Sequence, residues 1–526
     1  MFSSDEQVGW QSDVRVLSEF FTVHHMFRVL GSNRKLCNGF GRRDFLQAGS
    51  LGLAGLGLSD LLRADAQAAT ATDTSAENSF GKAKRCILLF LYGSPSQLET
   101  FDMKPEAPAE IRGTMEPIAS SVPGLDVCEL LPETSKIMDR TTVVRSMTHP
   151  YPIHGVAYAM TGIPTIDVAM ELAPHDPRHH PWFGSVVEYI DRQRRGSASE
   201  FVQNVALPFH FSSQRTDQPF RSGPYGAFLG SGFNPTWTEF NGKGTVHIEK
   251  DRGGGFAYSG PEPYLGCSRD THFQISSTAP LPDVTMDRLD RRKTLLEQFD
   301  ESRRHFDKSA AGASLDKFQQ QAFSLVSSPS VSKSLDTRLE SDSTRDRYGM
   351  TLFGQGCLAA RRLVESGTRL ATVFWDEYGL AGDAWDTHFK HYPRMKDQLM
   401  PGFDRAYSGL ILDLEERGML DDTLVVCLSE HGRTPKINSA VGGGRDHWSK
   451  AYSAIFAGGG IAKGNVIGAT DRHAGEVLSR PVSPKDALAT MYHLLGIHPH
   501  TLLHDRGNRP VPLVPENNGV VQEMLA

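Results

Sequence analysis

Several short runs of the chain are predominantly apolar, without the alternation of apolar and polar residues that marks a half-exposed strand. They are "RCILLFL" at 85–91, "TTVV" at 141–144, "RLATVFW" at 369–375, "DTLVVCL" at 422–428 and "AYSAIFA" at 451–457. Runs of this kind are typical of strands that are buried on both faces of a parallel sheet. Each run leads into polar residues or glycines, so each predicted strand ends at a loop.

Helical patterns lie between these runs. One covers 349–367, a second covers 397–420 and a third covers 483–496, each with apolar residues three to four positions apart. In the third, Ser483 is suited to cap the helix and Pro484 to occupy its first turn. Helices that alternate with strands predict an α/β fold with a mostly parallel central sheet and helices on both of its faces.

The middle of the chain has a different composition. Residues 197–345 are rich in glycine and proline up to about 265, and polar with a helical pattern after that. We interpret this segment as a long insertion or cap within one α/β domain, which is expected to span 83–515. The open parallel sheets of such domains bind ligands beyond the carboxyl ends of their strands.

The N-terminal part indicates export. Arg42 and Arg43 precede a mildly apolar stretch rich in Gly, Ala and Leu, and small residues follow at Ala64, Ala66, Ala68 and Ala69. This pattern predicts a twin-arginine signal over 1–69, followed by a polar linker at 70–82. An amphipathic helix of the folded domain is the alternative, but the glycine content argues against it. The apolar stretch is too short for a membrane span, so we expect a periplasmic or extracellular protein with no span after cleavage.

Composition excludes some classes of partner. The chain of 526 residues has a formal net charge of −7, so no basic excess points to nucleic acid. Its six cysteines form no C-x-x-C pair, and several lie inside apolar runs, which argues against a disulfide framework. An anionic substrate would need a local positive patch or a metal ion.

Three motifs that contain histidine follow one another along the chain. They are "AWDTHFKH" with Asp386 and His388, "SEHGRTP" with Glu430 and His431, and "GGGRDHW" with His447. Carboxylates and imidazoles together are ligands for zinc or a similar divalent ion. A surface histidine, or an aspartate hydrogen-bonded within a loop, is the commoner explanation for any one pair. Three motifs in order, two of them just past predicted strands, favour a metal site.

The order of these motifs resembles the alkaline phosphatase and sulfatase superfamily. A more specific resemblance is to an exported bacterial family, domain of unknown function 1501, which is related to that superfamily. The resembling pieces extend from about residue 42 to about residue 500, and they include "LFLYGSPSQLETFDMKP", "HGVAYAMTGIP", "DRYGMTLFGQGCLAARRLVESG", "WDTH", "LVVCLSEHGRTPKIN", "GGGRDHW" and "VIGATDR".

The resemblance implies a fold and a set of ligands. Proteins of the superfamily hold one or two divalent metals at the carboxyl edge of a parallel sheet. By this resemblance Glu430, His431 and His447 are metal ligands, and Asp386 and His388 form the earlier pair. The superfamily usually has Asp where this chain has Glu430, and often spaces the earlier pair as Asp-x-x-x-His. The implied cofactor is a divalent ion such as zinc, calcium or manganese.

Two departures from the superfamily pattern concern its chemistry. The metal-binding Asp at the end of the first strand is missing from "YGSPS" at 92–96, and Asp102 is the nearest substitute. The usual nucleophile is also missing, because "HPYPIHGVAYAMTG" offers His154 but no Ser or Cys. His154 could bind metal, act as a nucleophile or orient a partner. The remaining routes are a metal-activated water, a histidine nucleophile or no catalysis.

These residues predict a function of one of two classes. The first is a secreted metal-dependent hydrolase of sulfate or phosphate esters, in which Arg433 and Arg445 neutralise a small anionic ester or a sulfated glycan. Structural salt bridges within the loops are an equally good interpretation of the two arginines. The second class is a catalytically inactive secreted protein that keeps the fold and binds a glycan or a protein partner.

The export hypothesis is testable by replacing both Arg42 and Arg43 with Lys. The twin-arginine pathway reads the arginine pair, so the double variant should accumulate in the cytoplasm while the wild type is recovered from the periplasm. Cell fractionation followed by immunoblotting measures this distribution. Equal periplasmic recovery of both proteins would exclude the twin-arginine route.

Overall fold

A computed structural model of the chain describes residues 78–526, except for 153, 155, 163–167, 175, 177, 196–201, 216–219, 254, 276–328 and 515–517. The signal predicted for 1–69 and most of the linker predicted for 70–82 lie outside the described residues, as does much of the segment 197–345. Within the described residues, no helix is both long enough and apolar enough to cross a bilayer.

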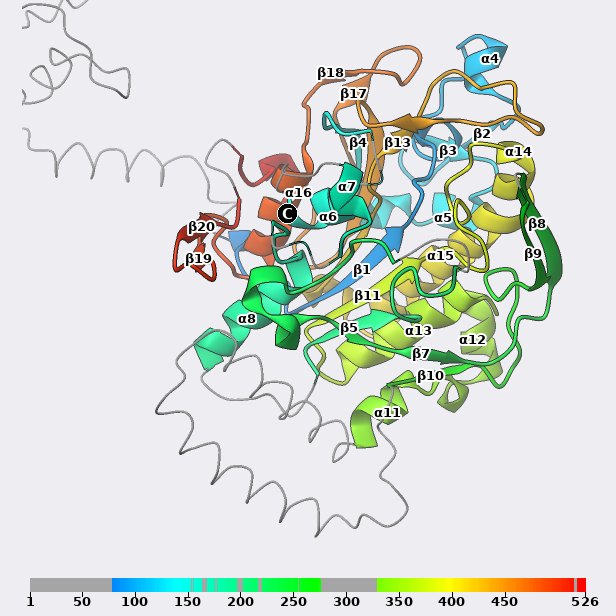
Figure 1. Ribbon diagram of the computed structural model, residues 1–526. Helices are drawn as coiled ribbons and strands as arrows, with labels where there is room; N and C mark the ends of the chain where they lie inside the picture. Colours follow the sequence, from blue (N-terminus) through cyan, green and yellow to red (C-terminus); the bar gives the residue numbers. More distant parts are fainter. Residues whose placement is uncertain are drawn as a thin grey trace, which may run out of the picture. The chain divides into compact units, whose positions relative to one another are not determined.

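A central sheet forms the framework of the described residues (Figure 1). Its eight strands lie in the order β16 (Asn465–Ile467), β4 (Thr141–Met147), β15 (Tyr452–Ala457), β12 (Thr423–Leu428), β1 (Arg85–Leu91), β11 (Leu370–Trp375), β5 (Asn204–Leu207) and β6 (Thr236–Trp237). All of them run in one direction except β15, which is antiparallel to both of its neighbours. The predicted mostly parallel α/β fold is confirmed.

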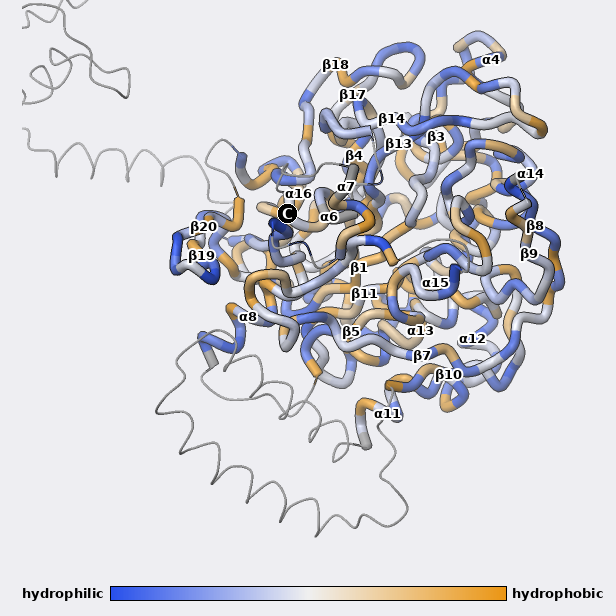
Figure 2. The backbone as a smooth tube through the Cα atoms, in the orientation of Figure 1, coloured by the Kyte–Doolittle hydropathy of each residue, from blue (hydrophilic) through white to orange (hydrophobic). Residues whose placement is uncertain are grey.

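The apolar runs of the sequence occupy the centre of this sheet. β1 pairs with β12 on one side and β11 on the other, and its residues from Cys86 to Leu91 are at most 3% exposed. A strand between two others and covered on both faces has no position for a polar side chain, which explains the absence of alternation. Figure 2 shows hydrophobic residues concentrated along β1, β11 and α13.

Helices cover both faces of the sheet (Figure 1). On one face, α13 (Leu352–Glu365) packs on β11 and α15 (Met400–Glu416) packs on α13. On the other face lie α8 (Phe183–Arg195) and α16 (Pro484–Leu494), whose Phe183 and Tyr492 rings are in contact. Ser483 caps α16 in a capping box, as predicted, and α15 ends just before Gly418.

The remaining elements are short. The helices are α4 (Ala109–Arg112), α5 (Pro132–Ser135), α6 (Val156–Thr161), α7 (Val168–Glu171), α11 (Pro329–Leu335), α12 (Asp342–Tyr348) and α14 (His391–Arg394). Small antiparallel pairs join β2 (Pro117–Ala119) to β3 (Asp126–Cys128), β7 (Glu239–Asn241) to β10 (His272–Gln274), β8 (His247–Gly253) to β9 (Phe256–Pro261), β13 (Gly432–Arg433) to β14 (His447–Trp448), β17 (Ala469–Thr470) to β18 (Val477–Ser479), and β19 (Leu502–His504) to β20 (Pro510–Pro512).

The segment 197–345 is not only an insertion, which corrects its interpretation from sequence. Its first part supplies β5 and β6, the two outermost strands on one side of the central sheet. β5 has only four residues and β6 only two, so neither is long enough to produce a recognisable apolar run in a glycine-rich and proline-rich context. The chain also continues past 515, where Leu525 pairs with Ile461.

The direction of the strands determines where polar loops gather. β1, β4, β11 and β12 are parallel, so the residues that follow them lie along one edge of the sheet. β15 runs the other way, and therefore the residues that precede it lie along that same edge. The motifs after β11 and β12 and the motif before β15 thus meet there.

Candidate metal centre

A tight turn at the end of β1 forms the floor of the site. Its residues Gly93 and Ser94 both have positive φ angles, of 93° and 71°. The Gly93 N–H donates a hydrogen bond to Glu430 Oε1 at 2.8 Å. A Cβ at position 93 would lie 2.2 Å from the backbone nitrogen of Asp386, so only glycine allows the loops after β1 and β11 to come so close.

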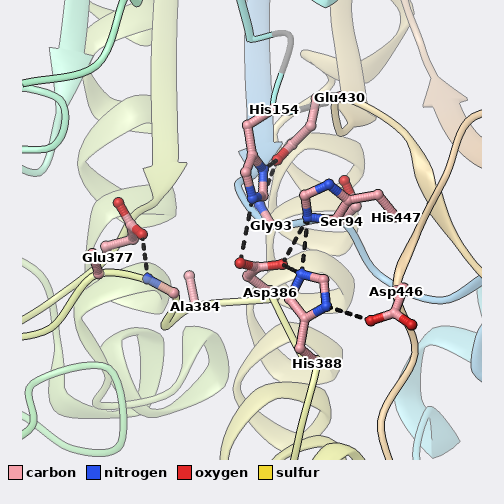
Figure 3. Close-up of polar contacts among 12 residues, drawn as sticks. Gly93, Ser94, His154, Glu377, Ala384, Asp386, His388, Glu430, Asp446 and His447 are labelled. Atoms are coloured by element: carbon pink, nitrogen blue, oxygen red, sulfur yellow. Dashed lines mark hydrogen bonds and ion pairs between the residues drawn. The ribbon is translucent and has the colours of Figure 1, made fainter. Parts of the chain in front are cut away.

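His154 joins the two carboxylates of the site (Figure 3). Its Nδ1 lies 2.9 Å from Glu430 Oε1, and its Nε2 lies 3.3 Å from Asp386 Oδ2. His154 is 8% exposed, and both carboxylates are buried. The predicted candidate His154 is therefore brought together with residues from two of the three predicted motifs.

The third motif completes the cluster. His447 Nε2 lies 3.3 Å from Asp386 Oδ1 and 3.0 Å from His388 Nε2. His388 Nε2 lies 3.1 Å from the same Asp386 oxygen, and its Nδ1 bonds to Asp446 Oδ1 at 2.7 Å. Asp446, which sequence reasoning did not single out as a ligand, thus orients His388, and its place beside His447 in "GGGRDHW" was the available signal.

Two groups of side chains have the composition and spacing of a metal site. In each of them, one ligand atom per residue lies within 4.8 Å of the others. One group is His154, His431 and His447, and the other is Asp386, His388 and His447. Both are mixed or all-histidine sets, which suit zinc and similar divalent ions.

Buried atoms without partners test whether a metal ion would fit. Glu430 Oε2 and His431 Nε2 are buried, and neither has a hydrogen-bond partner in the described part of the chain. His431 Nδ1 is engaged at 2.8 Å by the carbonyl of Gly432, which leaves Nε2 as the free ring nitrogen. Unpaired buried polar atoms are costly, and these two are of the types that coordinate divalent ions. The residues present therefore fit a metal ion.

Electrostatics separates the histidines into two classes. Burial opposes the charged form of His154, but the carboxylates of Asp386 and Glu430 outweigh it and raise the pKa of His154 to about 9. For His431, burial and the nearby His447, Arg433 and His154 all lower the pKa, well below its ordinary value. His431 is therefore neutral at pH 7, which is the form that binds metals.

The comparison with protein families agrees with the motifs. A family model described as "Protein of unknown function (DUF1501)" matches residues 83–525. The chain belongs to the DUF1501 family. The comparison with curated proteins finds no match.

Several solved structures are similar to this DUF1501 chain. The PsFucS1 sulfatase from Pseudoalteromonas sp. is 11% identical with a TM-score of 0.37, covering 86% of this chain and 75% of that one. The phosphonate monoester hydrolase SpPMH from Silicibacter pomeroyi is 10% identical with a TM-score of 0.31, and the match covers 78% of this chain and 73% of that one. The lipoteichoic acid synthase LtaP from Listeria monocytogenes is 10% identical with a TM-score of 0.30, and the match covers 80% of this chain and 74% of that one. These likenesses are distant and assign no function to the DUF1501 chain.

Arg433 is held entirely within the protein. It is 0% exposed, and its guanidinium pairs with Asp386 Oδ1 at 2.5 Å. Its other bonds go to the backbone carbonyls of Gly93, Ser94 and Arg445. Arg433 therefore ties the turn after β1 to the loop of Asp386, and the geometry favours a structural salt bridge over binding of an anion.

Arg445 has the same character and lies beside a different carboxylate. It is 0% exposed, pairs with Glu99, and donates further bonds to the carbonyls of Ile111, Thr434 and Pro435. Burial favours the neutral form of Glu99, but Arg445 and His391 outweigh burial and lower the pKa of Glu99 to about 2. Glu99 thus anchors Arg445, a role that the sequence did not reveal.

Asp102 is placed apart from both metal-binding groups. Its carboxylate pairs with Lys104 at 2.8 Å, lies 3.6 Å from Arg145 and accepts a hydrogen bond from Thr470. These partners already occupy both of its oxygens. In the described residues, the substitute for the missing first-strand aspartate is therefore not drawn into the cluster, and Gly93 binds Glu430 through its backbone instead.

Replacing Glu99 with Gln tests the structural role assigned to Arg445. The variant leaves a buried guanidinium without its counter-ion, which should lower the free energy of unfolding by about 3–5 kcal/mol at pH 7. The pKa of Glu99 falls from 4.5 to about 2 on folding, so its contribution is complete above pH 4.5. That contribution disappears as the pH falls through about 2.

Urea unfolding of wild type and Glu99→Gln between pH 7 and pH 2 measures this effect. The difference between the two proteins should stay constant above about pH 5 and shrink below pH 4.5. Glu133→Gln, which removes an exposed pair with Lys136, serves as the control and should change stability by less than about 1 kcal/mol. A pH-independent difference would contradict the ionised Glu99–Arg445 pair.

Proposed function

We propose that this protein is an exported hydrolase of sulfate or phosphate esters that depends on a divalent cation. One observation carries the proposal: the three histidine motifs and His154 converge at the carboxyl edge of the sheet, where two ligand-type atoms, Glu430 Oε2 and His431 Nε2, are buried without partners in the described residues. The substrate class is a small anionic ester or a sulfated glycan. Export by the twin-arginine route is part of the proposal.

Five residues would hold the cation. Asp386, His388 and His447 form one set, and Glu430 and His431 supply two more ligands. His154 lies beside them, bonded to Asp386 and Glu430. When bound, a divalent ion supplies Lewis-acid chemistry, which stabilises negative charge on an ester oxygen and makes water more acidic. Zinc suits the nitrogen-rich set better than manganese or calcium, which prefer oxygen ligands.

The surroundings of His154 support water over histidine as the nucleophile. Both of its ring nitrogens face carboxylates, Nδ1 toward Glu430 and Nε2 toward Asp386, so neither presents a free lone pair for attack. The same contacts hold a proton on His154. This arrangement suits a residue that gives or takes a proton beside the reacting group.

Two features support the second candidate, a catalytically inactive protein that binds a glycan or a protein partner. The position of the usual nucleophile holds a histidine that is engaged on both sides. Arg433 and Arg445, the two predicted anion-binding residues, donate their hydrogen bonds to groups of the protein itself. Bound metal is compatible with both candidates, so turnover decides between them.

The first expectation concerns metal content. Protein purified without chelators should contain one or two divalent ions per chain by elemental analysis, and His431→Ala or His447→Ala should lower that content. Asp102→Asn should not, because Asp102 is bound to Lys104 and Thr470 instead. Chelation should also lower the melting temperature of the wild type. A metal-free wild type that melts identically with and without chelator would remove the basis of the proposal.

The second expectation concerns turnover on a panel of sulfate, phosphate and phosphonate esters. Metal-loaded wild type should hydrolyse at least one class, and Glu430→Ala should abolish the activity. His154→Ala should keep some activity, reduced about 10²- to 10⁴-fold, because water remains the nucleophile. Complete loss in His154→Ala, together with an acid-labile phosphohistidine in the wild type, would instead identify a histidine nucleophile. Metal-loaded protein without any turnover would favour the binding protein.

A further inference from the structure

Arg221 is a cation beside the cluster that the sequence motifs did not mark. Two of its nitrogens are engaged by carboxylates: Nε lies 3.4 Å from Glu377, and Nη1 pairs with Glu171. The third nitrogen, Nη2, has no hydrogen-bond partner among the described residues. Arg221 is 7% exposed, so a small part of its surface is open to a ligand.

The ion pairs of Arg221 make it rigid. Its side chain is 9% exposed, and Glu377 is also bound by Arg215 at 2.9 Å. The positive charges of Arg221 and Arg215 therefore balance the negative charges of Glu377 and Glu171. These ion pairs fix the plane of the Arg221 guanidinium and leave its Nη2 atom unbonded. A guanidinium held in this way loses little side-chain entropy when it binds an anion.

Tyr92 connects Arg221 with the cluster of histidines. The Tyr92 ring stacks on His154, with centroids 5.1 Å apart, and the guanidinium carbon of Arg221 lies 5.3 Å from the same ring. Tyr92 is 0% exposed, yet its hydroxyl has no hydrogen-bond partner in the described part of the chain. A buried hydroxyl without an acceptor costs free energy that an incoming acceptor would recover.

We infer that the Tyr92 hydroxyl and Arg221 Nη2 form a recognition site for a tetrahedral oxyanion, the sulfate or phosphate group of the substrate. This inference rests on the proposed function, and it assigns to Arg221 the task that Arg433 and Arg445 cannot perform. Both groups are donors, and both lack an acceptor among the described residues. Arg221 lies over the Tyr92 ring, and that ring stacks on His154 (Figure 3 shows His154 with Asp386 and Glu430). An oxyanion offers acceptors to both.

The test is calorimetric titration of the full chain with inorganic phosphate and with inorganic sulfate. Tyr92→Phe and Arg221→Gln should each weaken the affinity about 10- to 100-fold, as expected for the loss of one hydrogen bond to a charged group. Arg221→Lys should lie between wild type and Arg221→Gln, because it keeps the charge and loses the planar fork. Metal content should be unchanged in all three variants.

Tyr92→Phe is the decisive variant, because it removes only an oxygen atom that has no partner within the described residues. Its melting temperature should equal or exceed that of the wild type, while its affinity for the anion falls. Arg178→Gln, which removes an exposed cation paired with Asp176, is the control for charge and should bind phosphate like the wild type. This design holds even if Arg221→Gln unfolds after losing its two ion pairs.

Each outcome decides the inference. Unchanged anion affinity in Tyr92→Phe, no anion binding by the wild type, or loss of metal together with anion binding in Tyr92→Phe would each overturn it. The titrations are run on metal-loaded and on chelator-treated protein, so that failure of the proposed function is seen separately as a wild type that holds no metal. Anion binding that depends on Tyr92 in either state supports the recognition site.

Discussion

The close contact between Gly93 and Asp386 is the constraint on which the site depends. The turn after the central strand β1 packs its Cα against the backbone of the loop after β11, at a distance that no side chain would allow. The same turn donates its N–H to Glu430 after β12, and its carbonyls accept from Arg433. Three neighbouring strands are thereby joined at their carboxyl ends, and the carboxylates of the site are held a few ångströms apart.

The buried polar groups around this contact are of two kinds: those bonded entirely within the protein, and those with one atom left unbonded. Arg433 and Arg445 are saturated by carbonyls and one carboxylate each, so they stabilise loops and cannot also serve a ligand. Glu430, His431 and Tyr92 each keep one atom that nothing in the described residues satisfies. Unsatisfied buried atoms are uncommon in folded proteins because they are costly. All three residues contact His154, so a ligand bound beside His154 would find acceptor and donor atoms without partners.

Much of this arrangement followed from the sequence, because it depends on strand direction and strand ends. Apolar runs at 85–91, 369–375 and 422–428 gave the three central strands, and their carboxyl ends gave the edge where Asp386, Glu430 and His431 meet. The reversed direction of β15 was not visible, since a buried strand has the same composition in either direction. The very short strands β5 and β6 were missed because their burial comes from neighbours far away in sequence.

The roles of individual side chains were harder to predict than their positions. Whether an arginine binds a ligand or a carbonyl depends on backbone atoms that carry no sequence signal, and this decided Arg433 and Arg445. Asp102 has the right residue type near the right strand, but Lys104 and Thr470 occupy it. Arg221 lies in a glycine-rich and proline-rich segment without any motif, and only its three-dimensional neighbours identify it.

The wide separation of the contributing residues has a consequence for how the site forms. Gly93 and Glu430, which are hydrogen-bonded, are 337 residues apart in the chain. They follow the neighbouring strands β1 and β12, which are far apart in sequence. Contacts of such long range form late and slowly, because loop closure must precede them. A fragment that ends before residue 430 lacks Glu430, His431 and His447. A metal ion bound by the full set of ligands must therefore be captured by a nearly complete chain.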